Sequence, residues 1–311
     1  MPLTAQITLF ILALTMLDAG PAWAAKKNPE GDAAAQFGAE ISIGGEYDDN
    51  VTVDEVDLSS SQGDYALNVS AKVEANTSLS KATDLDLSYN YSQSKYNEFS
   101  QVDRQTHILG SNFEVDMGKV NSGLSLFYID SRLDGSKFLK LYRASPSLSG
   151  FVAKKWFARG AYVYSDKIIE ERSQRDATSN AGEFDVYYFR RGLRSYFNVG
   201  IQYKDEDADA VEFDYIAANF KVRYVHRFHL FSKNSVLELA FRYEDRQYSS
   251  PTPSIEEKRS DERQRWRIDL EIPVIERGAI EFYGAYSDYS SNLPRADYTQ
   301  KIIGTRFVYT W

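Results

Sequence analysis

The sequence contains no cysteine, and this absence narrows its possible chemistry. Without a thiol, the chain cannot form disulfides, bind a metal through thiolates or carry a lipid on a cysteine. Histidine is scarce, with 3 residues in 311. Lysine and arginine number 36 against 45 acidic residues, and the net charge of −9 argues against a nucleic-acid partner.

Long apolar runs are missing after residue 17, although a membrane helix needs about 20 such residues. The one run, Ile7 to Leu17, is followed by Ala22-Trp23-Ala24. Its length and small-residue ending match a secretory signal peptide, with a short N-terminal anchor as the alternative. We therefore expect a signal peptide over residues 1–24 and a short periplasmic segment over residues 25–36.

Aromatic residues are abundant, although the mean hydropathy is only −0.46. They make up 14% of the chain, with 22 Tyr and 18 Phe. A membrane barrel reconciles these values, because only alternate residues of each strand face lipid and aromatic residues gather at both interfaces. One or two soluble β domains are the alternative.

Alternation of apolar and polar residues recurs along the chain and predicts strands. It is cleanest over residues 37–50, 65–77 and 83–91. Further segments are centred on Leu109, Leu126, Leu141, Tyr162, Tyr187, Val199, Val222, Leu239, Ile268 and Phe282, and the last strand ends the chain. Pro146 and Pro273 weaken two of them, because proline cannot donate to a strand ladder. We predict an all-β, transmembrane, antiparallel up-and-down barrel over residues 37–311, with about 14 strands and with 12 or 16 as alternatives.

The connections between these segments alternate in length. Short turns are expected near residues 79–82, 118–121, 153–155, 191–194 and 276–278. Longer loops are expected near residues 51–63, 95–104, 131–138, 166–180, 204–212, 247–262 and 288–296. Short periplasmic turns and long outer loops are the arrangement of outer-membrane barrels, and it places both termini on the periplasmic side.

Inward positions, taken as those opposite the apolar stripe, carry many charges. The early strands are mainly acidic, whereas the later strands carry many arginines. The candidate residues for contact with a solute are Glu46, Lys72, Arg223, Arg242, Arg267 and Arg306. Opposed charges could line a water-filled passage that filters a polar solute. They could equally form an ion-pair network that plugs the lumen, and the sequence leaves both open.

No residues point clearly to catalysis, a metal or a cofactor, and we expect none. Asp205, Glu206, Asp207 and Asp209 could bind calcium, but their spacing differs from that of known loop sites and favours a solvated loop tip. His107 is a remote candidate for a barrel lipid hydrolase. Ser111 lies on the same strand face, but about 13 Å away, too far for a base to activate it.

The last residues resemble the C-terminal signal strand of bacterial outer-membrane barrels. Ile303, Phe307, Tyr309 and Trp311 fall on alternate positions up to the terminal carboxylate. The resemblance implies an outer-membrane location, contact with outer-membrane lipids, and recognition by periplasmic chaperones and the barrel assembly machinery.

The segment Ile43 to Val51 resembles the opening hairpin of export-associated barrels. In these a G-x-x-Y-D-x-N-V motif ends the first strand, and here Gly44, Tyr47, Asp48, Asn50 and Val51 match it. The barrel domains of surface lipoprotein assembly modifiers are the family that the chain resembles. The helical repeat domain that precedes their barrel has no counterpart in this sequence. The resemblance implies a fourteen-stranded barrel and the export of a protein or polysaccharide.

Together these features predict an outer-membrane barrel that acts as a channel or as an export and assembly conduit for a polar or macromolecular substrate. A structural or adhesive barrel with a plugged lumen is the alternative, and a lipid hydrolase is a more distant one.

Overall fold

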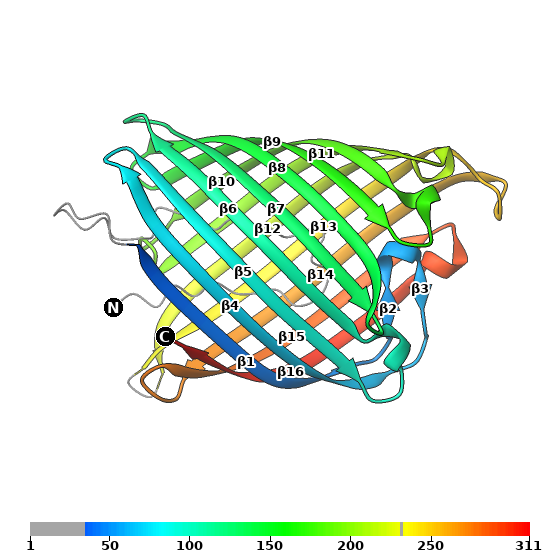
Figure 1. The fold of residues 1–311 in the computed structure, drawn as a ribbon, viewed down its shortest axis with the longest axis horizontal. Helices are drawn as coiled ribbons and strands as arrows, with labels where there is room; N and C mark the ends of the chain where they lie inside the picture. The colour runs from blue at the N-terminus through cyan, green and yellow to red at the C-terminus, as the bar shows by residue number, and fades with distance from the viewer. Residues whose placement is uncertain (1–34, 231–232) are drawn as a thin grey trace.

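The computed structural model describes residues 35–230 and 233–311, which form a closed antiparallel barrel of 14 strands (Figure 1). The strands are β1 (Gln36–Asp48), β4 (Asp64–Ser80), β5 (Thr83–Tyr96), β6 (Arg104–Asp116), β7 (Asn121–Leu133), β8 (Ser136–Ala153), β9 (Trp156–Ile169), β10 (Ala177–Phe189), β11 (Ser195–Ala208), β12 (Tyr215–Leu230), β13 (Lys233–Thr252), β14 (Glu257–Pro273), β15 (Gly278–Ser291) and β16 (Tyr298–Thr310). Each strand pairs with its sequence neighbour, which confirms the predicted up-and-down barrel and excludes 12 or 16 strands. The expected signal peptide lies outside the described residues.

The barrel closes between its first and last strands. Glu40 pairs with Thr310 and Asp48 pairs with Ile302, with no break in register between them. The backbone N–H of Trp311 also donates to the carbonyl of Ala39, at 2.9 Å. Closure removes both sheet edges, so no strand is left with an unpaired row of backbone groups.

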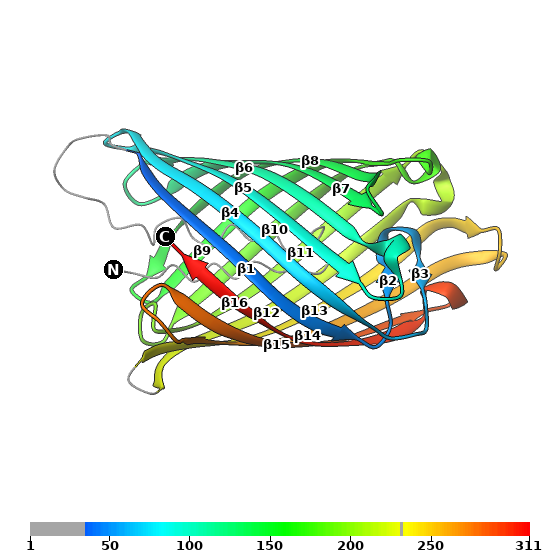
Figure 2. The ribbon, with the colours of Figure 1, turned by 60° about the horizontal axis from the view of Figure 1, so that its bottom comes forward.

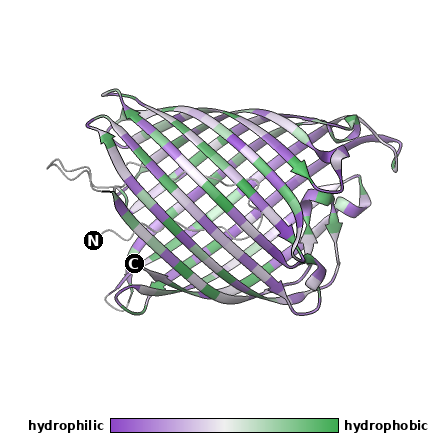
Figure 3. Ribbon diagram, in the orientation of Figure 1, coloured by the Kyte–Doolittle hydropathy of each residue, from purple (hydrophilic) through white to green (hydrophobic). Residues whose placement is uncertain are grey.

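Hydrophobic and hydrophilic residues alternate along the strands (Figure 3), and their exposures place apolar residues on the outer face and polar residues on the inner face. In β1, Ile41 and Ile43 are about half exposed. Ser42, which lies between them, and Glu46 are buried. Aromatic side chains lie at both ends of the outer face. Tyr47 and Tyr65 pack together at one end, and Tyr309 and Trp311 pack together at the other.

The two ends of the barrel differ in their connections. One end, here called the turn end, carries the C-terminus and the short turns 81–82, 117–120, 154–155, 190–194 and 274–277 (Figures 1 and 2). The opposite end, here called the loop end, carries the connections 49–63, 97–103, 134–135, 170–176, 209–214, 253–256 and 292–297. The predicted sidedness of the connections is therefore confirmed.

Several predicted loops are shorter than expected because the strands extend further toward the loop end than the alternation indicated. The predicted loop 131–138 is a two-residue turn in which Asp134 and Gly135 both have positive φ, 46° and 74°. An Asp-Gly pair favours this hairpin geometry. The predicted loop 247–262 is mostly a hairpin of β13 and β14, with an irregular register between Gln247 and Pro251 that accommodates the proline.

Pro146 and Pro273 lie in strands, as predicted. Pro146 pairs with Leu124 of β7, but the β8–β9 ladder skips from Ala144 to Ser147. Pro273 is the last residue of β14, where the loss of a donor matters least.

Helical structure in residues 35–230 and 233–311 is limited to 3-10 turns at the loop end: η2 (Asp54–Val56), η3 (Ser100–Val102), η4 (Ser173–Arg175), η5 (Val211–Phe213) and η6 (Pro294–Ala296). Within this part of the chain, no helix is long and apolar enough to cross a membrane.

Candidate functional site: the charged lumen and its mouth

The six residues predicted to face the lumen all lie on inward positions of their strands. Glu46 and Arg306, from the two strands that close the barrel, are 5% and 7% exposed, whereas the outward Ile303 is 69% exposed. Lys72, Arg223, Arg242 and Arg267 alternate in the same way with outward apolar residues of β4, β12, β13 and β14. The structure thus places these residues together inside one barrel.

Most of these inward cations pair with carboxylates on the same or a neighbouring strand. Arg306 donates to both oxygens of Glu281, at 2.8 and 3.1 Å. Arg267 pairs with Asp269 at 2.8 Å, and Arg242 pairs with Glu244 at 3.0 Å. Further pairs are Arg223 with Glu238, at 3.6 Å, and Lys72 with Glu74. These contacts hold the guanidinium groups along the wall.

The arginines of the wall formed by β12 to β16 also lie over tyrosine rings. Arg267 and Arg306 lie 5.2 and 5.5 Å from the ring centre of Tyr283, whose hydroxyl donates to Glu46 at 2.8 Å. Arg263 lies 4.9 Å from the ring centre of Tyr289. Contact with a ring face stabilises a cation that has lost part of its water.

The wall formed by β4 to β6 carries the opposite charge near the turn end. Asp84 pairs in register with Glu114, and Asp86 pairs with Asn112, so these side chains share the inner face. Asn112 donates to Asp86 at 3.5 Å, and Asn121 donates to Glu114 at 2.6 Å. The predicted polarity of the inner surface, acidic on the early strands and arginine-rich on the late ones, is therefore present in the fold.

The connection between β1 and β4, residues 49–63, is here called the mouth loop. It was predicted as one of the longer outer loops, near residues 51–63, and the structure has a long connection there. It forms a small hairpin, β2 (Thr52–Val53) and β3 (Leu58–Ser59), with η2 between them (Figure 2). Val51, Val53 and Val56 are only 2–3% exposed, which no solvated loop would allow.

The mouth loop packs into the open end of the barrel. Val53 and Val56 form a cluster with Phe138, Leu139 and Ile169 of β8 and β9. Asp54, on the other side of the loop, accepts hydrogen bonds from Tyr289 of β15 and Tyr298 of β16. Contacts to strands so far apart in the closed order require the loop to cross the opening.

Two arginines hold the carboxylate of Asp57 from opposite sides of the mouth. Arg259 of β14 donates to both of its oxygens, at 3.0 and 2.8 Å, and Arg175 of η4 donates at 2.6 Å. Strands β10, β11, β12 and β13 separate these two arginines in the barrel. Asp57 has φ 53° and ψ 44°, a left-handed conformation that aspartate tolerates better than most residues.

Glu55 makes the third charged contact of the loop. Arg104 at the start of β6 donates to its two oxygens, at 3.0 and 3.1 Å. Burial alone would raise the pKa of Glu55 and of Asp57, but the charges and hydrogen bonds of their arginines outweigh it. The pKa of each carboxyl therefore lies below its usual value.

The residues of the export-type motif turn the chain from β1 into the mouth. Gln300 of β16 donates to Asp48 at 2.9 Å, and Asn50 donates to the carbonyl of Thr299 at 2.9 Å. The side-chain oxygen of Asn50 accepts from Ser59 and from the N–H of Ser61. These hydrogen bonds fix the conformation of the chain where it leaves β1 and enters the mouth loop. The spacing of the three valines within an acidic segment is the sequence signal that could have revealed the inward fold.

The other candidates are not assembled into a site. Strand β11 continues to Ala208, so Glu206 points inward to Lys167 and Lys204 while Asp205 and Asp207 alternate outward. The described residues contain no group of three potential metal ligands. His107 accepts or donates a hydrogen bond with Tyr89, at 2.8 Å, and its ring packs on Tyr91.

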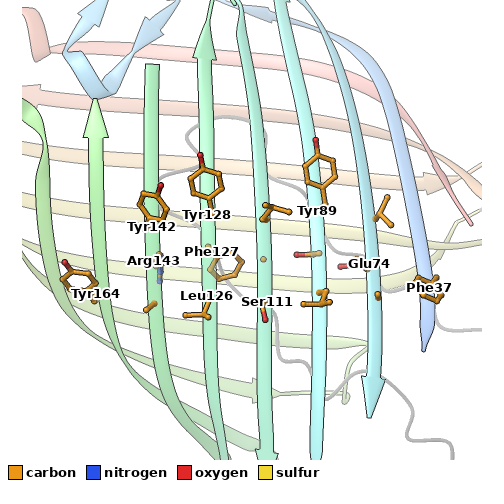
Figure 4. Close-up of a pocket in the computed structure, with 17 residues that line it drawn as sticks. Phe37, Glu74, Tyr89, Ser111, Leu126, Phe127, Tyr128, Tyr142, Arg143 and Tyr164 are labelled. Carbon is orange, nitrogen blue, oxygen red and sulfur yellow. The ribbon is translucent and has the colours of Figure 1, made fainter. Parts of the chain in front are cut away.

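A hollow on the outer face is lined by Phe37 of β1 and by residues of β4 to β9, among them Tyr89, Tyr128, Tyr142 and Tyr164 (Figure 4). Leu87, Leu109, Leu126 and Tyr142, which line it, are exposed on the apolar outer face, and Phe127 and Arg143 at inward positions also contribute to it. The C-terminal residues Ile303, Phe307 and Trp311 are exposed on the same outer face.

No protein-family model matches the sequence, and no curated protein is similar enough to count as a relative. Solved outer-membrane barrels share the fold, and two of them serve as examples. An anion-selective porin from Comamonas acidovorans has a TM-score of 0.53 and 6% identity, covering 90% of this chain and 100% of that chain. In-vitro folded OmpT, an outer membrane protein of Vibrio cholerae, has a TM-score of 0.53 and 8% identity, covering 92% of this chain and 100% of that one. The chain thus has the fold of outer-membrane β-barrels.

Proposed function

We propose that the protein is an outer-membrane channel for small charged solutes and that the mouth loop closes its outer end. The observation that supports this most is the inner surface, with carboxylates on β4 to β6 facing arginines on β12 to β16. Fixed charges of opposite sign create a transverse field that selects and orients a charged solute.

The outer-membrane location is supported by the apolar outer face and its aromatic ends. The apolar residues are on the outside of the barrel and not in its interior, so they avoid water only if the outer face contacts lipid. In this orientation the turn end faces the periplasm and the mouth loop faces the outside. Trp311 then lies at the periplasmic interface, where periplasmic chaperones and the barrel assembly machinery would recognise the last strand.

A conduit for an exported protein or polysaccharide, which the motif resemblance implies, would require the mouth loop to leave the opening. A plugged structural barrel is the second candidate. It is favoured by the carboxylate partners of Arg242, Arg267 and Arg306, which neutralise part of the inner surface.

Planar-bilayer recordings distinguish these functions. The open reference is a variant in which two glycines replace residues 51–62. We expect this variant to conduct and its reversal potential in a salt gradient to indicate anion preference. Changing Arg223, Arg242 and Arg267 together to Gln should shift the reversal potential toward cations.

A matched control changes the exposed Arg190, Arg191 and Arg295 to Gln, which alters net charge equally outside the inner wall. It should leave selectivity unchanged. If the loop-deleted variant inserts but passes no current, the barrel is plugged and the channel function is wrong.

A further inference from the structure

The mouth loop is a separate unit that is attached to the barrel mainly through side chains. At its base, the backbone N–H of Asp49 donates to the carbonyl of Lys301 on β16, at 3.0 Å. Beyond this point its backbone hydrogen bonds join its own residues: Val51 to Gln62, Ser60 to Val51, and Asp57 to Asp54. The ladders of β1 with β4 and with β16 end before the loop begins. The loop can therefore move out of the mouth without breaking the strand pairing of the barrel.

In every charged contact between loop and barrel, the negative group belongs to the loop. The loop supplies carboxylates, Asp54, Glu55 and Asp57, and the barrel supplies guanidinium or phenol donors. Removal of the loop would take these carboxylates away from Arg104, Arg175 and Arg259, of which Arg259 would keep its contact with Asp261. Guanidinium groups bind carboxylates and phosphates in the same two-point geometry.

We propose that these three arginines form the entry site for a small multivalent anion and that the mouth loop occupies this site as an internal competitor. This rests on the proposed channel function and names its substrate class. Arg175 donates both to the carbonyl of Glu55, at 3.1 Å, and to the carboxylate of Asp57, at 2.6 Å, so the groups that these arginines bind lie close together. The site therefore fits a ligand with more than one anionic group, such as a di- or tricarboxylate. The anion replaces the loop carboxylates at the arginines, and the loop leaves the mouth.

The valines of the loop determine how strongly an anion must bind to displace the loop. Val53 and Val56 hold the loop through apolar contacts that an anion does not replace. A univalent anion, which replaces one carboxylate, should therefore displace the loop poorly. A multivalent anion that contacts several arginines binds the open form much more strongly and shifts the population toward it.

Calorimetric titration of citrate into the detergent-solubilised protein tests the site itself. Without the competing loop, the variant lacking residues 51–62 should bind citrate at least tenfold more tightly than wild type. Adding Arg175→Gln and Arg259→Gln to that variant should abolish binding, whereas adding Arg295→Gln should not. Acetate should bind weakly to both forms, and spermidine should not compete with citrate. Equal citrate affinity in wild type and the loop-deleted variant, or no binding to either, would overturn the proposal.

Bilayer recordings separate this proposal from the channel function. Citrate on the outer side should raise the open probability of the wild type, whereas the loop-deleted variant should already be open. If the loop-deleted variant conducts but citrate neither binds nor opens the wild type, the channel function stands and the anion site is wrong. If citrate binds as expected but no form conducts, the anion site stands and the channel function is wrong.

Discussion

Asp57 and Arg259 are 202 residues apart in the sequence, yet they form a two-point contact, at 2.8 and 3.0 Å, across the mouth of the barrel. Arg259 is 2% exposed, and it also pairs with Asp261. This contact joins the first loop of the barrel to the hairpin of β13 and β14. It is one of the contacts that hold the mouth loop across the opening.

Loss of the Arg259 side chain should release the mouth loop. Breaking a buried ion pair costs about 3 kcal/mol or more, which is about a hundredfold in the population of the released form. Because the chain has no cysteine, Val56→Cys provides a single buried reporter for thiol labelling. In this background Arg259→Gln should speed labelling about a hundredfold, and Arg259→Lys should have a smaller effect because it keeps the charge. Unchanged labelling in Arg259→Gln would show that the valines alone hold the loop.

Acidification should release the loop only at low pH. The pKa of Asp57 is lowered from 3.8 in the folded protein, so its contribution to docking is complete above that value. The contribution is lost as the pH falls through the lowered folded-state pKa. Glu55 behaves in the same direction from its ordinary value of 4.5. Thiol labelling of Val56→Cys, corrected for the intrinsic pH dependence of the reagent, should be constant from about pH 7 to pH 5. Release near pH 6 would contradict this assignment.

Gly44 should be required for barrel closure. A Cβ at this position would lie 2.2 Å from the carbonyl oxygen of Thr305 and 2.5 Å from Cβ of Arg306 on β16. Gly44→Ala should therefore destabilise the folded barrel by about 1–3 kcal/mol. The measurement is the denaturant midpoint or the heat-modifiable shift on gels. Gly38→Ala, in the same strand but with nothing within 4 Å of the added carbon, is the control and should behave like wild type.

Trp311 should be required for membrane assembly. Trp311→Asp places a charge at the end of the closing strand, on the outer face. We expect less folded, heat-modifiable protein in cell envelopes. Trp156→Asp changes a residue of similar exposure, 45% against 55%, that lies outside the last strand. An equal defect in both variants would indicate general loss of an aromatic anchor and would argue against a specific terminal signal.

The alternation of residues was sufficient to predict the strands and their inward faces. An apolar outer face and a polar inner face impose one rule on every strand, so positions such as Arg242 and Arg306 could be assigned without long-range information. The mouth loop could not be predicted in this way, because Asp57 and Arg259 meet only after the barrel has closed. The Asp134-Gly135 turn was missed for a different reason. Asp-Gly is a clear two-residue hairpin pattern. The strand that follows it contains two adjacent buried residues, Phe138 and Leu139, which pack on the loop valines and interrupt the alternation that would have revealed the strand.

The most direct test of the account compares the single-channel conductance of the wild type with that of the variant in which two glycines replace residues 51–62. Both proteins are refolded, checked for heat-modifiable mobility and reconstituted in the same lipid. We predict a predominantly closed wild type and a steadily conducting variant. Equal conductance in the two proteins would show that the mouth loop does not close the barrel, and absence of current in both would show that the barrel is not a channel.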